Sequence, residues 1–133
     1  MASPPDHGTT SLTCPEARNH VRAVLRPLCD ALPARQAELL LQDACLITSE
    51  LVTNAMLHAG GVTDFDVSVE GRTLIIRVSD GSATLPTPRS SNPAVPGGHG
   101  WFVVQRLSTD ITVEPDVHGK TVRVTLDASR MAV

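Results

Sequence analysis

The sequence has few aromatic residues, no long apolar run and no basic cluster. Only 2% of its 133 residues are aromatic, so a hydrophobic core must be built mainly from Leu, Val, Ile and Ala. No apolar run is long enough to cross a bilayer, which argues against a membrane protein. The formal net charge is −3 and Lys or Arg residues form no run, which argues against direct binding of nucleic acid.

The cysteines and the N-terminal residues favour a reduced chain in the cytoplasm. Cys14, Cys29 and Cys45 are odd in number and lack the spacing of metal ligands. The first ten residues (MASPPDHGTT) are polar and contain proline, unlike a signal peptide. The length is typical of one domain, and we expect a disordered tail at residues 1–9 and a single domain at residues 10–133.

The periodicity of apolar residues changes several times along the chain. The predicted elements are an edge strand at 10–14, a helix at 15–32 that Pro27 kinks or shortens, a helix at 35–59 ended by two glycines, hairpin strands at 63–70 and 73–79, a helix at 100–107, and paired strands at 111–114 and 120–126. This order predicts an α+β fold in which helices cover one face of a mostly antiparallel sheet.

The predicted helix at residues 35–59 carries an unusual polar stripe. At about 100° per residue, Glu50, Asn54 and His58 fall within an arc of roughly 80°, with Asp43 two turns earlier in the same arc. Apolar residues, Met56 among them, fill the other side. A polar stripe is most often a solvated face, but such faces favour Lys, Glu, Gln and Arg, whereas this stripe places Asn and His in line. Both interpretations stay open from the spacing alone.

Two further motifs have an ordinary and a chemical interpretation. Asp80-Gly81 follows an apolar strand and is either a simple turn or a carboxylate that accepts from an amino group. The run Gly97-Gly98-His99-Gly100 leads into a helix and is either a hinge or a phosphate site made of backbone N–H groups.

Taken in order, these motifs resemble the ATP-binding domains of the GHKL (Bergerat-fold) family. The segment SELVTNAMLHA is similar to the N box of that family, VSDG to its first glycine box and GGHGWFVVQRLS to its second. The chain most resembles the small bacterial anti-sigma-factor serine/threonine kinases and their stand-alone regulatory relatives. The resemblance spans roughly residues 10–127 and implies a two-layer α/β sandwich, with an ATP lid at residues 82–99.

The resemblance also implies ligands and roles for individual residues. ATP and Mg²⁺ would be the cofactors, Asn54 the Mg²⁺ ligand and Glu50 the general base that accepts a proton from a serine hydroxyl or a water. Asp80 would bind the adenine amine with help from Thr121. The further nucleotide contacts would be Gly81, Gly98, His99, Gly100, His58 and Arg89.

Three functions are compatible with these residues. The first is a kinase that phosphorylates a serine or threonine of an antagonist protein and binds a sigma factor. The second is an ATP-responsive module that sequesters a partner without phosphorylating it. The third is a scaffold that has lost nucleotide binding, which the presence of Glu50, Asn54 and Asp80 disfavours. By resemblance, we also expect a homodimer.

Overall fold

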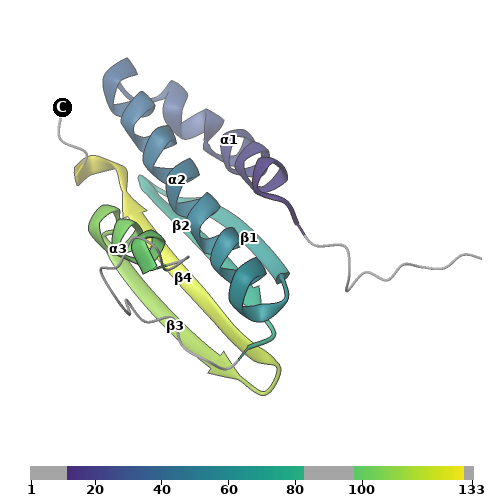
Figure 1. Cartoon of the computed structure of the whole chain (residues 1–133). Coiled ribbons are helices and arrows are strands. Elements are labelled where there is room, and N and C mark those ends of the chain that lie inside the picture. Colours follow the sequence, from purple (N-terminus) through teal and green to yellow (C-terminus); the bar gives the residue numbers. More distant parts are fainter. Residues whose placement is uncertain (1–11, 83–97, 131–133) are drawn as a thin grey trace, which may run out of the picture.

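The computed structural model describes residues 12–82 and 98–130 (Figure 1). The elements of this part of the chain are α1 (Cys14–Asp30), α2 (Ala34–Ala59), β1 (Val62–Glu70), β2 (Thr73–Asp80), α3 (Gly98–Leu107), β3 (Asp110–Asp116), β4 (Gly119–Asp127) and a 3₁₀ turn, η2 (Ala128–Arg130). The predicted tail at residues 1–9 lies outside the described residues, as does most of the predicted lid.

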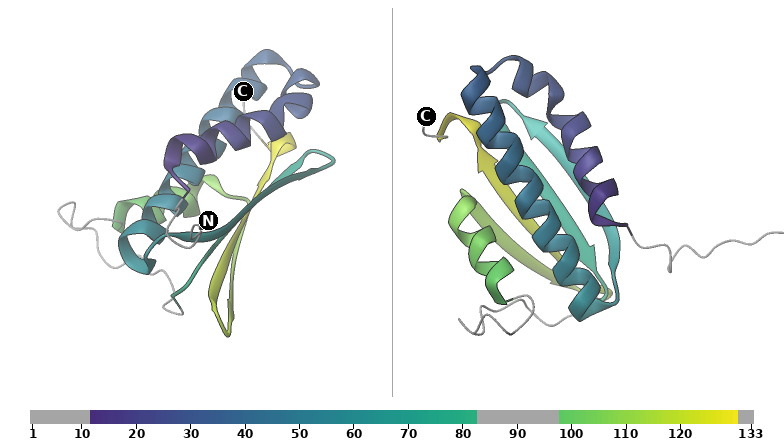
Figure 2. Two further views of the ribbon diagram at one scale, coloured as in Figure 1. Left: turned by 90° about the vertical axis from the view of Figure 1, so that its right-hand side faces the viewer. Right: turned by 45° about the horizontal axis from the view of Figure 1, so that its top comes forward.

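The four strands form one antiparallel sheet in the order β1-β2-β4-β3. The three helices lie together on one face of this sheet, with α2 across its middle, α1 on the side of β1 and α3 on the side of β3 (Figure 2). The α+β fold and the two-layer arrangement predicted from the sequence are therefore confirmed. None of the helices in the described ranges is long and apolar enough to span a membrane.

Local capping explains where the first helix begins and why one prediction was wrong. Thr13 Oγ1 accepts from the Glu16 N–H at 3.2 Å, and Glu16 Oε1 accepts from the Thr13 N–H at 2.9 Å. This reciprocal pair starts a helix at Cys14, so the predicted edge strand at 10–14 is wrong for its described residues. Pro27 lies inside α1, which continues past it to Asp30.

The core lies between the sheet and the helices. On β2 the residues Leu74, Ile76 and Val78 are almost fully buried and face the helices, while Ser79 and Arg77 point to the opposite face and Ile75, also on that face, is buried as well. The inward-facing residues of β4 are Val122, Val124 and Leu126. The main helix residues in this core are Val21, Leu25, Leu40, Ile47, Leu51, Trp101 and Val104.

One residue of α2 departs from the predicted pattern. Met56, placed on the apolar side from the sequence, is 49% exposed. The buried side of α2 instead contains Thr48, whose hydroxyl donates to the Ala44 carbonyl at 2.7 Å and so needs no partner outside the helix.

The end of α2 places its last turns beside the end of β2. Gly60 adopts a left-handed conformation (φ +77°), and the Gly61 N–H donates to the Ala55 carbonyl at 2.9 Å. The chain then enters β1 at Val62, which pairs with Asp80 at the last position of β2. The last turn of α2 and the Asp80-Gly81 motif, distant in sequence, therefore lie at the same end of the domain.

Candidate functional site

Helix α2 presents the predicted polar stripe without internal partners. Glu50 and Asn54 are half-buried and one helical turn apart, while His58 is exposed in the last turn. Their side chains form no hydrogen bond with any residue of the described ranges. Asp43, two turns before Glu50, is also half-buried, and burial raises the pKa of its carboxyl group. The carboxylate of Glu50 and the carboxamide of Asn54 are thus available to a ligand.

The carboxylate of Asp80 lies on the helix-facing side of the sheet. Asp80 is in phase with Val78 and Ile76 on β2, and it is only 7% exposed. Its Oδ1 atom accepts from the Ser82 N–H at 2.9 Å, so the turn after β2 holds one oxygen of the carboxylate.

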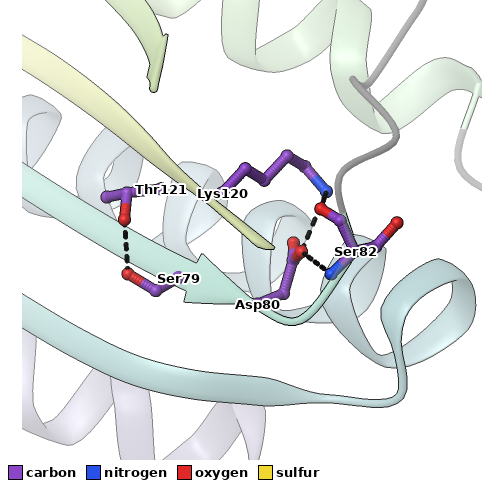
Figure 3. Close-up of polar contacts among 5 residues, drawn as sticks. All are labelled: Ser79, Asp80, Ser82, Lys120 and Thr121. Atoms are coloured by element: carbon purple, nitrogen blue, oxygen red, sulfur yellow. Dashed lines mark hydrogen bonds and ion pairs between the residues drawn. The ribbon is translucent and has the colours of Figure 1, made fainter. Parts of the chain in front are cut away.

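The structure adds Lys120, a residue to which the sequence reasoning assigned no role. Its Nζ atom donates to Asp80 Oδ1 at 2.9 Å and to the Ser82 carbonyl at 3.2 Å (Figure 3). The two side chains of this ion pair are 7% and 6% exposed. Lys120 is also the only lysine in the sequence, which otherwise has ten arginines.

The signal for Lys120 lies in the alternation of β4. The apolar residues Val122, Val124 and Leu126 occupy every second position, and Lys120 continues this series at the start of the strand. A lysine in phase with core residues must be buried, and a buried ammonium requires a carboxylate partner. Asp80 is that partner because it pairs directly with Lys120 in the sheet.

The two oxygens of the Asp80 carboxylate differ in their surroundings. Both hydrogen bonds that Asp80 accepts within the described ranges end on Oδ1, from Lys120 and from Ser82. Oδ2 receives no donor from any residue in those ranges. A buried carboxylate oxygen without a donor is costly, so the site is suited to an amino group supplied by a ligand.

The structure does not bring Thr121 together with Asp80. Thr121 follows Lys120 on β4, so its side chain points to the opposite face of the sheet. Its hydroxyl is 2.7 Å from the hydroxyl of Ser79 on that face, away from the Asp80 contacts (Figure 3). Thr121 therefore does not face Asp80 directly, and Lys120 occupies the position that does.

Gly119 allows β2 and β4 to approach closely beside this pair. It has a φ of +149°, and a Cβ atom there would lie 2.0 Å from the Asp80 carbonyl oxygen and 2.8 Å from the Gly81 Cα. Only glycine fits both the conformation and the space. The backbone of Asp80 is thus fixed from the side of β4.

The second glycine motif begins a helix, as predicted. Helix α3 starts at Gly98, so Gly98, His99 and Gly100 form its first turn, where backbone N–H groups lack partners within the helix. Contacts between α3 and α2 place the two helices side by side (Figure 1). Arg89 lies outside the described residues, together with residues 83–97 of the predicted lid.

Comparisons with known proteins identify the family and the fold of this chain. The family model described as "Histidine kinase-like ATPase domain" matches residues 14–126. No curated protein matches the chain. Among solved structures, the fold is similar to that of the histidine kinase domain from the Erythrobacter litoralis EL346 blue-light activated histidine kinase, with 24% identity and a TM-score of 0.51. The match covers 75% of this chain and 48% of that one, so the chain spans about half the length of this relative.

Proposed function

Because this chain belongs to the family of histidine kinase-like ATPase domains, we propose that it is an ATP-binding regulatory protein of the anti-sigma-factor kinase type. In this proposal it transfers the γ-phosphate of ATP to a serine or threonine of an antagonist protein. It would control transcription through binding of a sigma factor. The resemblance of residues 49–59, 78–81 and 97–108 to small anti-sigma-factor kinases supports the choice of partners.

One observation carries the nucleotide part of the proposal, namely the buried Asp80 carboxylate. Its Oδ1 is held by Lys120 and Ser82, while Oδ2 has no donor within the described ranges. The 6-amino group of adenine donates hydrogen bonds, whereas a phosphate or a carboxylate would be repelled by this oxygen. Asp80 would therefore select the base, with the backbone of Gly81 beside it.

Asn54 and Glu50 would act at the other end of the nucleotide. The carboxamide oxygen of Asn54 is a hard ligand of the kind that Mg²⁺ prefers, and Mg²⁺, when bound, neutralises charge on the phosphates. Glu50, one turn earlier on α2, would accept the proton of the attacking hydroxyl. The two residues share a face of one helix, so one could hold Mg²⁺ while the other accepts the proton at the same phosphate.

The start of α3 would hold the phosphates. Gly98 and Gly100 let a ligand approach the backbone closely, and the first-turn N–H groups of this ten-residue helix favour negative charge. His99, His58 and Arg89 are proposed as additional phosphate contacts.

Titration of the purified protein with ATP and Mg²⁺ tests the nucleotide site. We expect saturable binding that Asp80→Asn weakens by at least about tenfold, since a charged hydrogen bond is worth about 1.5–3 kcal/mol. The matched control is Asp66→Asn, which changes an exposed carboxylate on the open face of the same sheet. Absence of binding to the folded wild-type protein, or equal binding by both variants, would contradict the proposal.

Glu50→Gln tests the general-base role that the kinase proposal assigns to Glu50. The variant should bind ATP as the wild type does and lose release of the γ-phosphate, measured with radiolabelled ATP and Mg²⁺. Glu38→Gln is the control, because Glu38 lies on the same helix and pairs with Arg35 at the surface. Equal phosphate release by Glu50→Gln and wild type would remove the base role and favour the binding module.

A further inference from the structure

Lys120 and the turn after β2 both donate to the same oxygen of Asp80, Oδ1, and leave Oδ2 for a ligand. The ammonium group and the Ser82 N–H both donate to Oδ1, each at 2.9 Å. A second hydrogen bond from Lys120 Nζ reaches the Ser82 carbonyl at 3.2 Å, so Lys120, Asp80 and Ser82 are each bonded to the other two (Figure 3). Rotation of the carboxylate about its Cβ–Cγ bond would break two of these three bonds.

We propose that Lys120 is a positioning residue for base recognition, which holds Asp80 so that Oδ2 alone faces the exocyclic amine of a purine. This proposal rests on the proposed function, because it assigns the residue that orients the adenine-reading carboxylate. Lys120 itself acts through Asp80 and needs no contact with the nucleotide. Without the ammonium group, the Ser82 N–H is the one remaining donor in the described ranges, and the carboxylate is free to turn.

A purely structural role for Lys120 makes a different prediction. Lys120 joins β4 to the turn after β2, so its loss could simply loosen this end of the sheet. Such loosening would lower the affinity for every nucleotide to the same extent. A positioning role instead concerns one atom of the ligand, the 6-amino nitrogen, so only nucleotides that carry this amine should be affected strongly.

The experiment compares two nucleotides that differ only in this amine, ATP and purine riboside triphosphate. We expect the wild type to prefer ATP by about 10- to 100-fold, the strength of a hydrogen bond to a charged acceptor. In Lys120→Met, which keeps the length of the side chain, this preference should fall to about threefold or less. The comparison is a double-mutant cycle in which the two changes are the loss of the Lys120 ammonium and the loss of the 6-amino group. Arg77→Met is the matched control, because it removes a cation from the open face of the same sheet and should keep the full preference.

An unchanged preference in Lys120→Met, with both nucleotides weakened equally, would refute positioning and leave the proposed function intact. Failure of the wild type to bind either nucleotide would instead overturn both proposals.

A second measurement covers the case in which Lys120→Met does not fold. Lys120 is the only lysine, so selective nitrogen-15 labelling of lysine in the wild type gives a single Nζ resonance. That resonance should shift more with ATP than with purine riboside triphosphate, because only the amine of ATP reaches the carboxylate that Lys120 holds. Equal shifts with the two nucleotides would refute the positioning role.

Discussion

Gly119→Ala tests whether the close approach of β4 to Asp80 holds this end of the sheet in place. The left-handed backbone conformation costs a non-glycine residue about 1–2 kcal/mol. The new Cβ would also lie 2.0 Å from the Asp80 carbonyl oxygen, and relieving such an overlap costs about a further 1–3 kcal/mol. We therefore expect the free energy of unfolding to fall by about 2–5 kcal/mol, a large part of the stability of a small domain.

Gly71→Ala provides a control at a second glycine of positive φ that lacks the steric contact. Gly71 also has a positive φ (+65°), but a Cβ there would meet nothing within 4 Å. In urea unfolding, Gly119→Ala should therefore be less stable than Gly71→Ala by the cost of the contact, about 1–3 kcal/mol, plus the greater strain of an alanine at φ +149°. ATP affinity should fall in Gly119→Ala, because the Asp80 backbone must move, and remain unchanged in Gly71→Ala. Equal unfolding midpoints for the two variants would refute the proposed constraint.

Two further predictions concern side chains of α2. Asn54→Ala should abolish the Mg²⁺-dependent part of ATP affinity, while ATP affinity in excess chelator stays unchanged. Asn19→Ala on α1 is the control, and an unchanged Mg²⁺ dependence in Asn54→Ala would exclude Asn54 as a ligand. Asp43→Asn should stabilise the protein at neutral pH, because burial raises the pKa of this carboxyl above its ordinary value of 3.8 and the folded state disfavours its ionised form. The stability that the protonated carboxyl of Asp43 contributes is lost as the pH rises through its raised pKa. The extra stability of Asp43→Asn over the wild type, measured by urea unfolding, should therefore shrink at about pH 3.5. Extra stability that does not depend on pH would contradict the raised pKa of Asp43.

Much of the fold follows from periodicity. The alternation in residues 63–79 and the apolar side of residues 35–59 predict the hairpin, the long helix and the helix-covered sheet that the structure contains. Met56 was misplaced because two faces of α2 are partly apolar, and sequence spacing does not show which of them meets the sheet. The strand predicted at 10–14 failed because a capping box between Thr13 and Glu16 determines this boundary more strongly than the apolar residues nearby.

The site could be predicted as a set of segments, but its chemistry depends on the phase of one strand. Resemblance directs attention to the hydroxyl of Thr121, because a hydroxyl near the adenine-binding carboxylate is what the motif implies. The phase of Val122, Val124 and Leu126 instead assigns Lys120 to the inner face and Thr121 to the outer one. A shift of one residue therefore exchanges a neutral hydroxyl for a buried ammonium next to Asp80.

That exchange changes what the carboxylate can do. A carboxylate without a fixed donor could turn either of its oxygens toward a ligand. The ammonium of Lys120, 2.9 Å away and equally buried, instead holds one oxygen of Asp80 and leaves the other available. Base recognition in this chain therefore belongs to the pair formed by the two strands, and replacing either member should alter the response to the 6-amino group more than replacing any other charged residue of the sheet.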